Sequence, residues 1–277
     1  MPHLIFTCKD TEYGLDISAV QEIVPTKALE NVKISSQWIK GATKIRQRYF
    51  YVFDFRKILG YQTLLEERQQ LVETLNQREK DHIDWLEALY KSITEGVEFT
   101  KAKDPTKCAF GKWYYSYKAP DSTIRRLLDQ FEDPHNRIHG LAERLLNLAE
   151  VDKKKAIEIL EEEKRFTLAK MLKLFAELKQ LLVTNIRSLM IVLGPSFDSS
   201  VVIEVDGIDN IRNLEKENLV PKQIKSQHDL VARVWTNETR TVYELDHDTL
   251  YKLLAREQYN ERSLNQTPGS TFESRAE

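Results

Sequence analysis

Residues 41–60 read GATKIRQRYFYVFDFRKILG, and within this stretch the sequence changes from strand character to helix character. Its middle, RYFYVFDF at 48–55, is rich in aromatic and β-branched residues, which predicts a β-strand. After Gly60, apolar residues recur at spacings of three, four and seven, which predicts helices. The stretch therefore separates a β-rich segment from a helical one.

Strand character appears on both sides of the helical segment. Before it, HLIFTCKD at 3–10 alternates apolar and polar residues, while SAVQEIV at 18–24 fits either a strand or a short helical turn. The later candidates are SLMIVLG at 188–194, SSVVIEVDGI at 199–208, DLVARVW at 229–235, and TVYELDHDTLYKLL at 241–254, a strand running into a helix. Neither flank is long enough to bury a good core alone, and insertions are best tolerated at exposed loop tips. We therefore expect one all-β domain that is split by a helical insert.

The insert has three predicted helices. The first has an inward stripe that includes His82 and Trp85, Asp121 or Ser122 caps the second, and the third runs from about Val151 to Thr184. We assign 1–62 and 188–256 to the β domain, 63–187 to the helical insert, and 257–277, a polar stretch with Pro268 and Gly269, to a disordered tail.

Composition limits the class of protein. The 277 residues carry a formal net charge of −2, which argues against a nucleic-acid partner. No run approaches about 20 apolar residues, and the N-terminus lacks a basic segment followed by an apolar one, so we expect neither membrane insertion nor export. We expect a cytoplasmic protein with both cysteines reduced. We find no convincing nucleophile–base set or phosphate loop, so we do not expect an enzyme.

Three histidines and one cysteine form a candidate metal site. His135 and His139 lie four residues apart, which places both imidazoles on one helix face, and His82 lies on the inward stripe of its own helix. Cys108 completes a set that suits Zn²⁺, which prefers four tetrahedral nitrogen and sulfur ligands. However, a lone histidine on an apolar face is more often a hydrogen-bonded core residue, and a lone cysteine is usually a small hydrophobe. The spacing alone therefore leaves both interpretations open.

A catalytic zinc is the less favoured form of this site. Metalloprotease helices carry HExxH, and the residue after His135 is Asn136 instead of glutamate. Four protein ligands also leave no position for a substrate water. A zinc hydrolase would need solvent-open coordination.

The order of these motifs resembles the chemoreceptor zinc-binding (CZB) family. His82 with Trp85, the string CAFGKWYYSY at 108–117 and HNRIH at 135–139 follow one another as in that family, over roughly residues 64–185. The resemblance implies a helical bundle with zinc held by His82, Cys108, His135 and His139. The family pattern Cys-x-Phe/Leu-Gly-x-Trp is met at Cys108, Phe110, Gly111 and Trp113, where we expect the glycine to allow a tight turn and the tryptophan to pack as an anchor.

The β flanks resemble CheW, the adaptor family that couples chemoreceptors to a histidine kinase. The similar segments are YGLDISAVQEIV, GATKIRQRYFYVFDFRKILG, VVIEVDGIDNIRNLEKENLVP and TVYELDHDTLYKLL. The resemblance implies paired five-stranded SH3-like barrels without a catalytic site, and it makes Arg46 the candidate partner contact. Two departures lie close by: Gln47 stands where the family has glycine, and Tyr51 where it has proline.

Together the resemblances imply a signalling adaptor for a CheA-like histidine kinase and chemoreceptors, with a homodimer formed through the bundle. The CZB resemblance further implies sensing of oxidants such as hypochlorous acid, with Cys108 as the redox-reactive thiolate. Zinc sensing by occupancy and a purely structural zinc are the alternatives. Cys8 lies in a candidate strand, and we expect it to be an inert core thiol.

Overall fold

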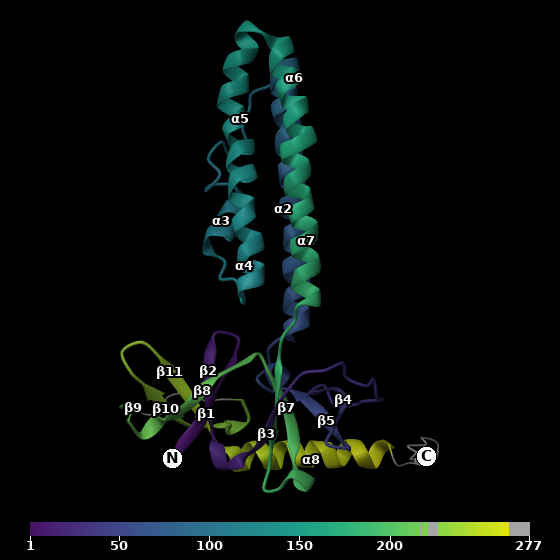
Figure 1. Cartoon of the computed structure of the whole chain (residues 1–277), viewed down its shortest axis with the longest axis vertical. Helices are drawn as coiled ribbons and strands as arrows, with labels where there is room; N and C mark the ends of the chain where they lie inside the picture. Colours follow the sequence, from purple (N-terminus) through teal and green to yellow (C-terminus); the bar gives the residue numbers. More distant parts are fainter. Residues whose placement is uncertain (217, 221–226, 266–277) are drawn as a thin grey trace. The chain divides into compact units, whose positions relative to one another are not determined.

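The computed structural model describes residues 1–216, 218–220 and 227–265. These residues pack into two compact units. Leu65–Ile186 form one unit, and Met1–Leu64 together with the chain from Arg187 onward form the other (Figure 1). No helix in the described ranges combines the length and the apolar character needed to cross a membrane.

The β unit contains two mixed sheets. The first has the strand order β8-β1-β2-β11-β10-β9 and the second the order β3-β6-β7-β5-β4. The first is formed by β1 (Pro2–Cys8), β2 (Thr11–Asp16), β8 (Gly207–Asn213), β9 (Asn218–Val220), β10 (Val231–Thr236) and β11 (Thr241–Leu245). The second is formed by β3 (Val20–Pro25), β4 (Ile39–Ile45), β5 (Arg48–Asp54), β6 (Leu189–Leu193) and β7 (Val201–Val205).

Each sheet joins strands from both sides of the helical unit. In the first sheet β2 pairs with β11 in parallel, and in the second β5 pairs with β7 in parallel, with Val52 opposite Val202. Asp54 ends β5 and caps the short helix α1 (Phe55–Ile58) by accepting hydrogen bonds from the next residues' backbone N–H groups. The two flanks therefore fold as one unit.

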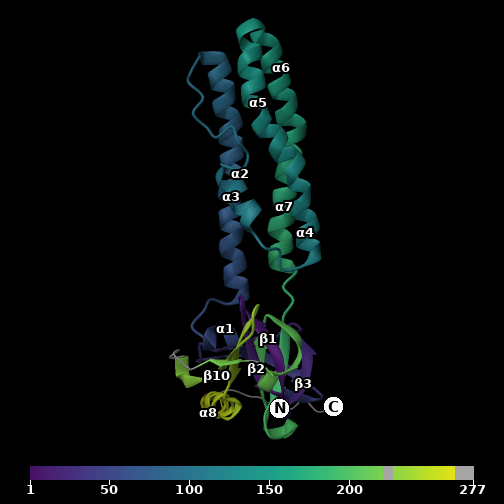
Figure 2. The same cartoon turned by 90° about the vertical axis from the view of Figure 1, so that its left-hand side faces the viewer.

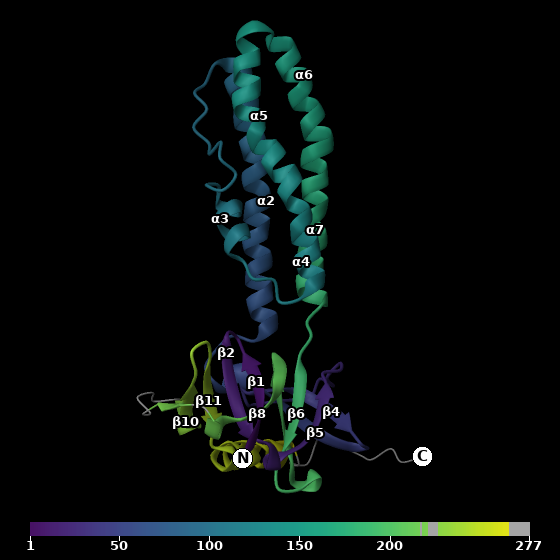
Figure 3. The ribbon, with the colours of Figure 1, turned by 60° about the vertical axis from the view of Figure 1, so that its left-hand side comes forward.

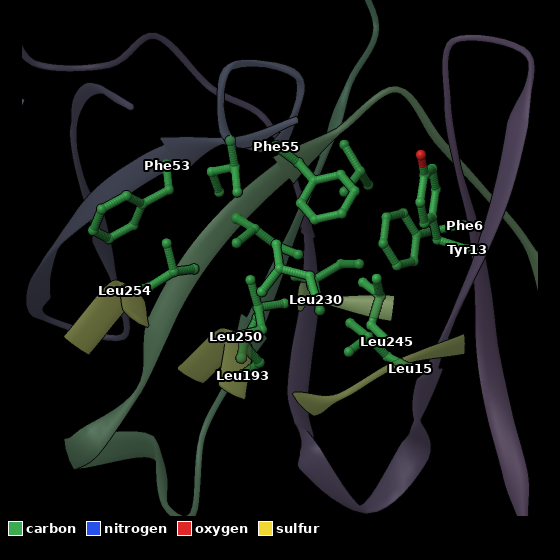
Figure 4. Close-up of a cluster of buried hydrophobic side chains, with 14 of the residues drawn as sticks. Phe6, Tyr13, Leu15, Phe53, Phe55, Leu193, Leu230, Leu245, Leu250 and Leu254 are labelled. Carbon is green, nitrogen blue, oxygen red and sulfur yellow. The ribbon is translucent and has the colours of Figure 1, made fainter. Parts of the chain in front are cut away.

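A large hydrophobic core, beside two smaller clusters, supports this unit. Figure 4 shows Phe6, Tyr13 and Phe55 close together, with Leu193 and Leu245 from the second flank in the same cluster. Phe6 and Phe55 pack edge to face with ring centroids 5.2 Å apart. Residues far apart in the sequence therefore share one apolar interior, which neither flank can form alone.

The fold class expected from the sequence, helices together with β-sheets, is confirmed, whereas the barrels are not. The sheets have six and five strands instead of five each, and the pairings among the described residues leave both sheets open. Strand pairing between distant segments decides the number of strands, and local sequence patterns do not specify it.

The predicted disordered tail begins too early. Helix α8 (His247–Asn265) continues through residues 257–265 of the segment that the sequence assigns to the tail, and residues 266–277 lie outside the described part. The Glu261 side chain is buried and accepts hydrogen bonds from the backbone N–H and hydroxyl of Ser35, both at 2.7 Å, and from the backbone N–H of Ser36. These bonds to a loop that is distant in the sequence hold the C-terminal part of α8, where the sequence shows no apolar stripe.

The other unit is a helical bundle (Figures 2 and 3). In both views α3 lies beside α2, and α4 lies beside α7. Its elements are α2 (Leu64–Glu95), α3 (Ala109–Ser116), α4 (Ser122–Leu128), α5 (Glu132–Val151), α6 (Lys153–Glu163), a π-helical turn (Lys164–Leu168) and α7 (Ala169–Thr184). Asp121 caps α4 by accepting from the backbone N–H groups of Thr123 and Ile124, so the predicted cap is confirmed.

An ion pair between a buried carboxylate and an exposed guanidinium adjoins the π-helical turn. The Glu163 carboxylate is 4% exposed and binds the Arg137 guanidinium of α5, with an Nη2–Oε1 distance of 2.6 Å. It also accepts a hydrogen bond from the Thr167 hydroxyl within the turn. This cluster ties α5 to the end of α6 and to the π-helical turn.

Candidate metal centre

Three helices bring together the side chains that the sequence selects. His82 lies on α2, His135 and His139 lie one turn apart on α5, and Cys108 is the N-cap residue of α3. The Cys108 sulfur accepts a hydrogen bond from the Gly111 backbone N–H at 3.1 Å, which fixes the thiol at the start of that helix.

The four side chains converge on one point. One ligand atom from each of His82, Cys108, His135 and His139 lies within 4.8 Å of the others. The His135 Nε2 atom is 3.2 Å from the Cys108 sulfur, and the His135 and His139 ring centroids are 4.8 Å apart. Such a set of three imidazoles and one thiol matches the donors that Zn²⁺ takes in closed sites.

Hydrogen bonds orient two of the imidazoles towards this point. His82 Nδ1 lies 2.7 Å from the Arg78 carbonyl oxygen, and His139 Nδ1 lies 3.0 Å from the Ala102 carbonyl oxygen. When each Nδ1–H donates to its carbonyl, the free lone pair of the imidazole lies on Nε2, where it can bind a metal ion. Both Nε2 atoms, and His135 Nδ1, are buried and lack a hydrogen-bond partner among the described residues.

These unpartnered atoms test whether a metal fits. A buried polar atom without a partner costs about 1–3 kcal/mol. One Zn²⁺ ion would satisfy the Nε2 atoms of His82 and His139 together, using donors of the preferred type. The residues present therefore fit zinc.

Burial keeps the histidines neutral. It lowers the pKa of His135 to about 3 and that of His139 to about 4, with the neighbouring His82 adding to both effects. Burial also lowers the pKa of His82. Neutral imidazoles have the free lone pair that metal binding requires.

Burial also favours the neutral form of Cys108, but for a thiol this raises the pKa. The backbone N–H groups of Gly111 and Phe110 partly oppose this rise. The metal-free thiol is therefore protonated at neutral pH, and coordination would favour the thiolate.

An aromatic shell encloses the cluster. The Phe110 ring packs edge-on against His82 and His135, with centroid distances of 5.6 and 5.0 Å. Trp85 packs against His139, and Trp113 against Phe110. Apolar surroundings of this kind exclude water and lower the local dielectric.

The predicted tight turn at Gly111 is wrong. Gly111 lies within helix α3, and it is not among the residues with positive φ. A Cβ atom there would lie 1.9 Å from the Pro105 carbonyl oxygen, so the glycine is needed for close approach of the preceding loop. This contact is between segments, and sequence reasoning took the glycine for a local turn.

The backbone acceptors are the part of the site that sequence reasoning missed. The carbonyl groups of Arg78 and Ala102 hold two imidazoles, yet every residue has a carbonyl group, so side-chain identity gives no signal for them.

Two other predicted residues lie in the β unit. Arg46 forms the turn between β4 and β5, where its side chain is 68% exposed and pairs with Glu22 at 3.0 Å. Gln47 follows it with a φ of 69°, which explains why glycine suits this position. Tyr51 is buried, so this departure from the expected proline lies in the interior of the β unit and not on an exposed surface.

Cys8 differs from Cys108 in its exposure. The Cys8 side chain is fully buried in the core of the β unit, and burial raises its pKa to about 12. This environment is that of an unreactive thiol.

A largely buried cluster of three neutral imidazoles and one thiol in a helical bundle defines a candidate zinc-binding domain. Comparison with known families agrees. Residues 82–146 match the chemoreceptor zinc-binding domain and include all four side chains of the cluster, and residues 2–80 match the CheW-like domain. The recognition of both families from the sequence and the assignment of zinc as the cofactor are confirmed.

Comparison with whole proteins adds less. No curated protein matches the chain. Among solved structures, the chain is similar to the scaffolding protein TtCheW from Thermoanaerobacter tengcongensis, with 10% identity, a TM-score of 0.39, and coverage of 88% of this chain and 83% of that one. At this score the family assignment rests on the matched domains.

Proposed function

We propose that the chain is a cytoplasmic signalling adaptor of the chemotaxis type, not an enzyme, and that its zinc–thiolate centre responds to oxidants such as hypochlorous acid. In this proposal, residues 1–62 and 188–256 form the CheW-like domain and residues 63–187 the inserted CZB bundle. The CheW-like domain would dock a CheA-like histidine kinase and chemoreceptors, with Arg46 at the contact. The proposal includes a homodimer through the bundle.

One observation carries the proposal: a cluster of zinc ligands with a partly accessible cysteine occurs in the same chain as a CheW-like domain. His82, Cys108, His135 and His139 would hold the ion. Bound zinc would favour the thiolate form of Cys108 near neutral pH, and this form reacts with oxidants.

The oxidation step removes a ligand. The Cys108 thiolate would take chlorine from hypochlorous acid and release hydroxide, giving a sulfenyl chloride. Water would then displace chloride and release a proton, leaving sulfenic acid, a poorer ligand. Without this ligand, α3 would lose one of its attachments to α2 and α5.

The test is zinc content per chain, measured by elemental mass spectrometry before and after a mild dose of hypochlorous acid. Cys108 oxidation is followed by peptide mass spectrometry, and kinase coupling is assayed in parallel. We expect one zinc per chain, released or loosened as Cys108 becomes oxidised, with a matching change in kinase activity.

The two cysteines provide a matched control. Cys8→Ser should leave zinc content and the oxidant response unchanged, whereas Cys108→Ser should abolish the response. Retained zinc with unmodified Cys108 would overturn the redox proposal and favour a structural zinc or a zinc-occupancy sensor. A full oxidant response in Cys108→Ser would also overturn it.

A further inference from the structure

One backbone carbonyl links two helices of the metal centre. The Ala102 carbonyl oxygen lies 2.7 Å from the Trp85 indole nitrogen of α2 and 3.0 Å from His139 Nδ1 of α5. Ala102 belongs to the segment between α2 and α3, which contains no helix or strand. A loop thus supplies the acceptor that orients a candidate ligand.

The indole ring is well placed to hold this loop. Trp85 is 4% exposed, and its ring packs edge-on against Phe99 of the same loop with centroids 5.0 Å apart. The Trp85 ring also packs against His139, with a centroid distance of 5.2 Å. An indole N–H only donates, so its bond to the Ala102 carbonyl does not depend on pH or tautomer.

His82 and His139 differ in how their acceptors are held. The acceptor for His82 is the Arg78 carbonyl, one turn earlier on the same helix, so α2 itself fixes that geometry. The acceptor for His139 lies 37 residues away, in the loop. The orientation of His139 therefore depends on whatever fixes the position of Ala102.

The same loop leads to the cysteine. It continues from Ala102 to Cys108, and its Pro105 carbonyl approaches Gly111 of α3 closely. A loop fixed at Ala102 thus constrains two of the four candidate ligands, His139 directly and Cys108 through the chain.

We propose that Trp85 is a positioning residue of the metal centre. Its indole N–H fixes the Ala102 carbonyl, and this carbonyl holds His139 as the Nδ1–H tautomer with Nε2 directed at the ion. The inference deepens the proposed zinc site and rests on it. Outer-shell partners of this kind change metal affinity by about 10- to 100-fold when they are removed.

The test compares Trp85→Phe with Trp113→Phe. Both changes shrink a tryptophan of the aromatic shell. The Trp85 indole donates to the Ala102 carbonyl, whereas among the described residues the Trp113 indole donates to none of the four ligands and to neither carbonyl that holds them. Zinc affinity is measured by competition with a chromophoric chelator, and the His139 tautomer by long-range ¹H–¹⁵N NMR on metal-free full-length protein.

We expect Trp85→Phe to weaken zinc binding about 10- to 100-fold and to give metal-free His139 a mixture of tautomers. Trp113→Phe should leave His139 in the Nδ1–H form and weaken binding far less. If Trp85→Phe does not fold, 3-benzothienylalanine at position 85 keeps the ring volume and removes only the N–H, and the same results are expected.

Equal zinc affinity in the two phenylalanine variants, or an unchanged His139 tautomer without the indole N–H, would overturn the inference. Failure of the proposed function is distinguishable from this result. A wild-type chain that takes up no zinc would refute the zinc centre, and the tautomer measurement on metal-free protein would still decide whether Trp85 positions His139.

Discussion

Replacing Gly111 by alanine should damage the metal centre although it adds only one methyl group. A Cβ at this position would lie 1.9 Å from the Pro105 carbonyl oxygen, and real Cβ atoms essentially never come within 3.0 Å of another heavy atom. The loop or α3 must therefore move by about 1.1 Å. The obstructing atom is backbone, so no side-chain rotation relieves the contact.

The size of the effect follows from two opposing terms. Overpacking costs about 1–3 kcal/mol, and a rigid backbone contact belongs at the upper end of this range. Alanine regains up to about 1 kcal/mol of helix propensity. The net loss of stability should be about 2 kcal/mol. Zinc affinity should fall at least about tenfold, because metal–ligand distances tolerate only about 0.2 Å of error and Cys108 lies at the start of the displaced helix.

Gly140→Ala is the matched control. Gly140 is also a helical glycine and directly follows His139, but a Cβ there would meet nothing within 4 Å. This substitution should raise stability by up to about 1 kcal/mol and leave zinc affinity unchanged.

The assay is urea unfolding followed by circular dichroism at 222 nm, combined with zinc competition against a chromophoric chelator. If Gly111→Ala unfolds at the wild-type urea concentration and binds zinc as tightly, then the Pro105 carbonyl does not pack against α3 and the steric account is refuted.

Three further predictions concern ionisable side chains that folding buries wholly or in part. Metal-free protein should lose stability as the pH falls from 7 to 5, because burial holds the folded-state pKa of His135 at about 3 and of His139 at about 4, below the ordinary 6.5, so that the unfolded chain binds more protons. Urea titrations across this range should show a loss of up to about 1.4 kcal/mol per pH unit for each histidine, and a flat profile would contradict buried neutral imidazoles. Glu163→Gln should destabilise the bundle by about 1–3 kcal/mol at pH 7. The hydrogen-bonded pair with Arg137 lowers the pKa of Glu163. The difference from wild type in urea unfolding should therefore disappear only at acidic pH, as the Glu163 carboxylate becomes protonated. Asp206→Asn should cost about 3 kcal/mol, since it breaks the ion pair with the buried Arg56 side chain; thermal unfolding should detect this loss with zinc affinity unchanged, and a loss below about 1 kcal/mol would show that this pair contributes little to stability.

Periodic side-chain patterns predicted the parts of this structure that depend on local geometry. His135 and His139 share a helix face because four residues make about one turn, and Asp121 caps a helix because its carboxylate reaches the next N–H groups. Spacing could not place Cys108 beside them, because that depends on the path of an irregular loop. The family resemblance supplied this step.

Contacts between distant segments explain what the sequence did not reveal. Gly111 faces a carbonyl from the preceding loop, and Ala102 acts through its backbone carbonyl. Glu261 accepts hydrogen bonds from Ser35, which lies 226 residues earlier in the sequence. None of these contacts leaves a periodic pattern. The number of strands in each sheet also depends on distant segments, because β5 pairs with β7 although the whole helical unit separates them in the sequence.

The position of Arg137 connects the metal centre to the rest of the bundle. It lies on α5 between two candidate ligands, His135 and His139, and its guanidinium reaches Glu163 at the edge of the π-helical turn. A π-turn is less regular than an α-helix and is often found at functional sites. Helix α5 therefore carries two candidate ligands and, between them, an ion pair with the last residue of α6. A change at Cys108 that moved α5 would have to strain or break this pair, so Glu163→Gln separates the two attachments without altering any ligand.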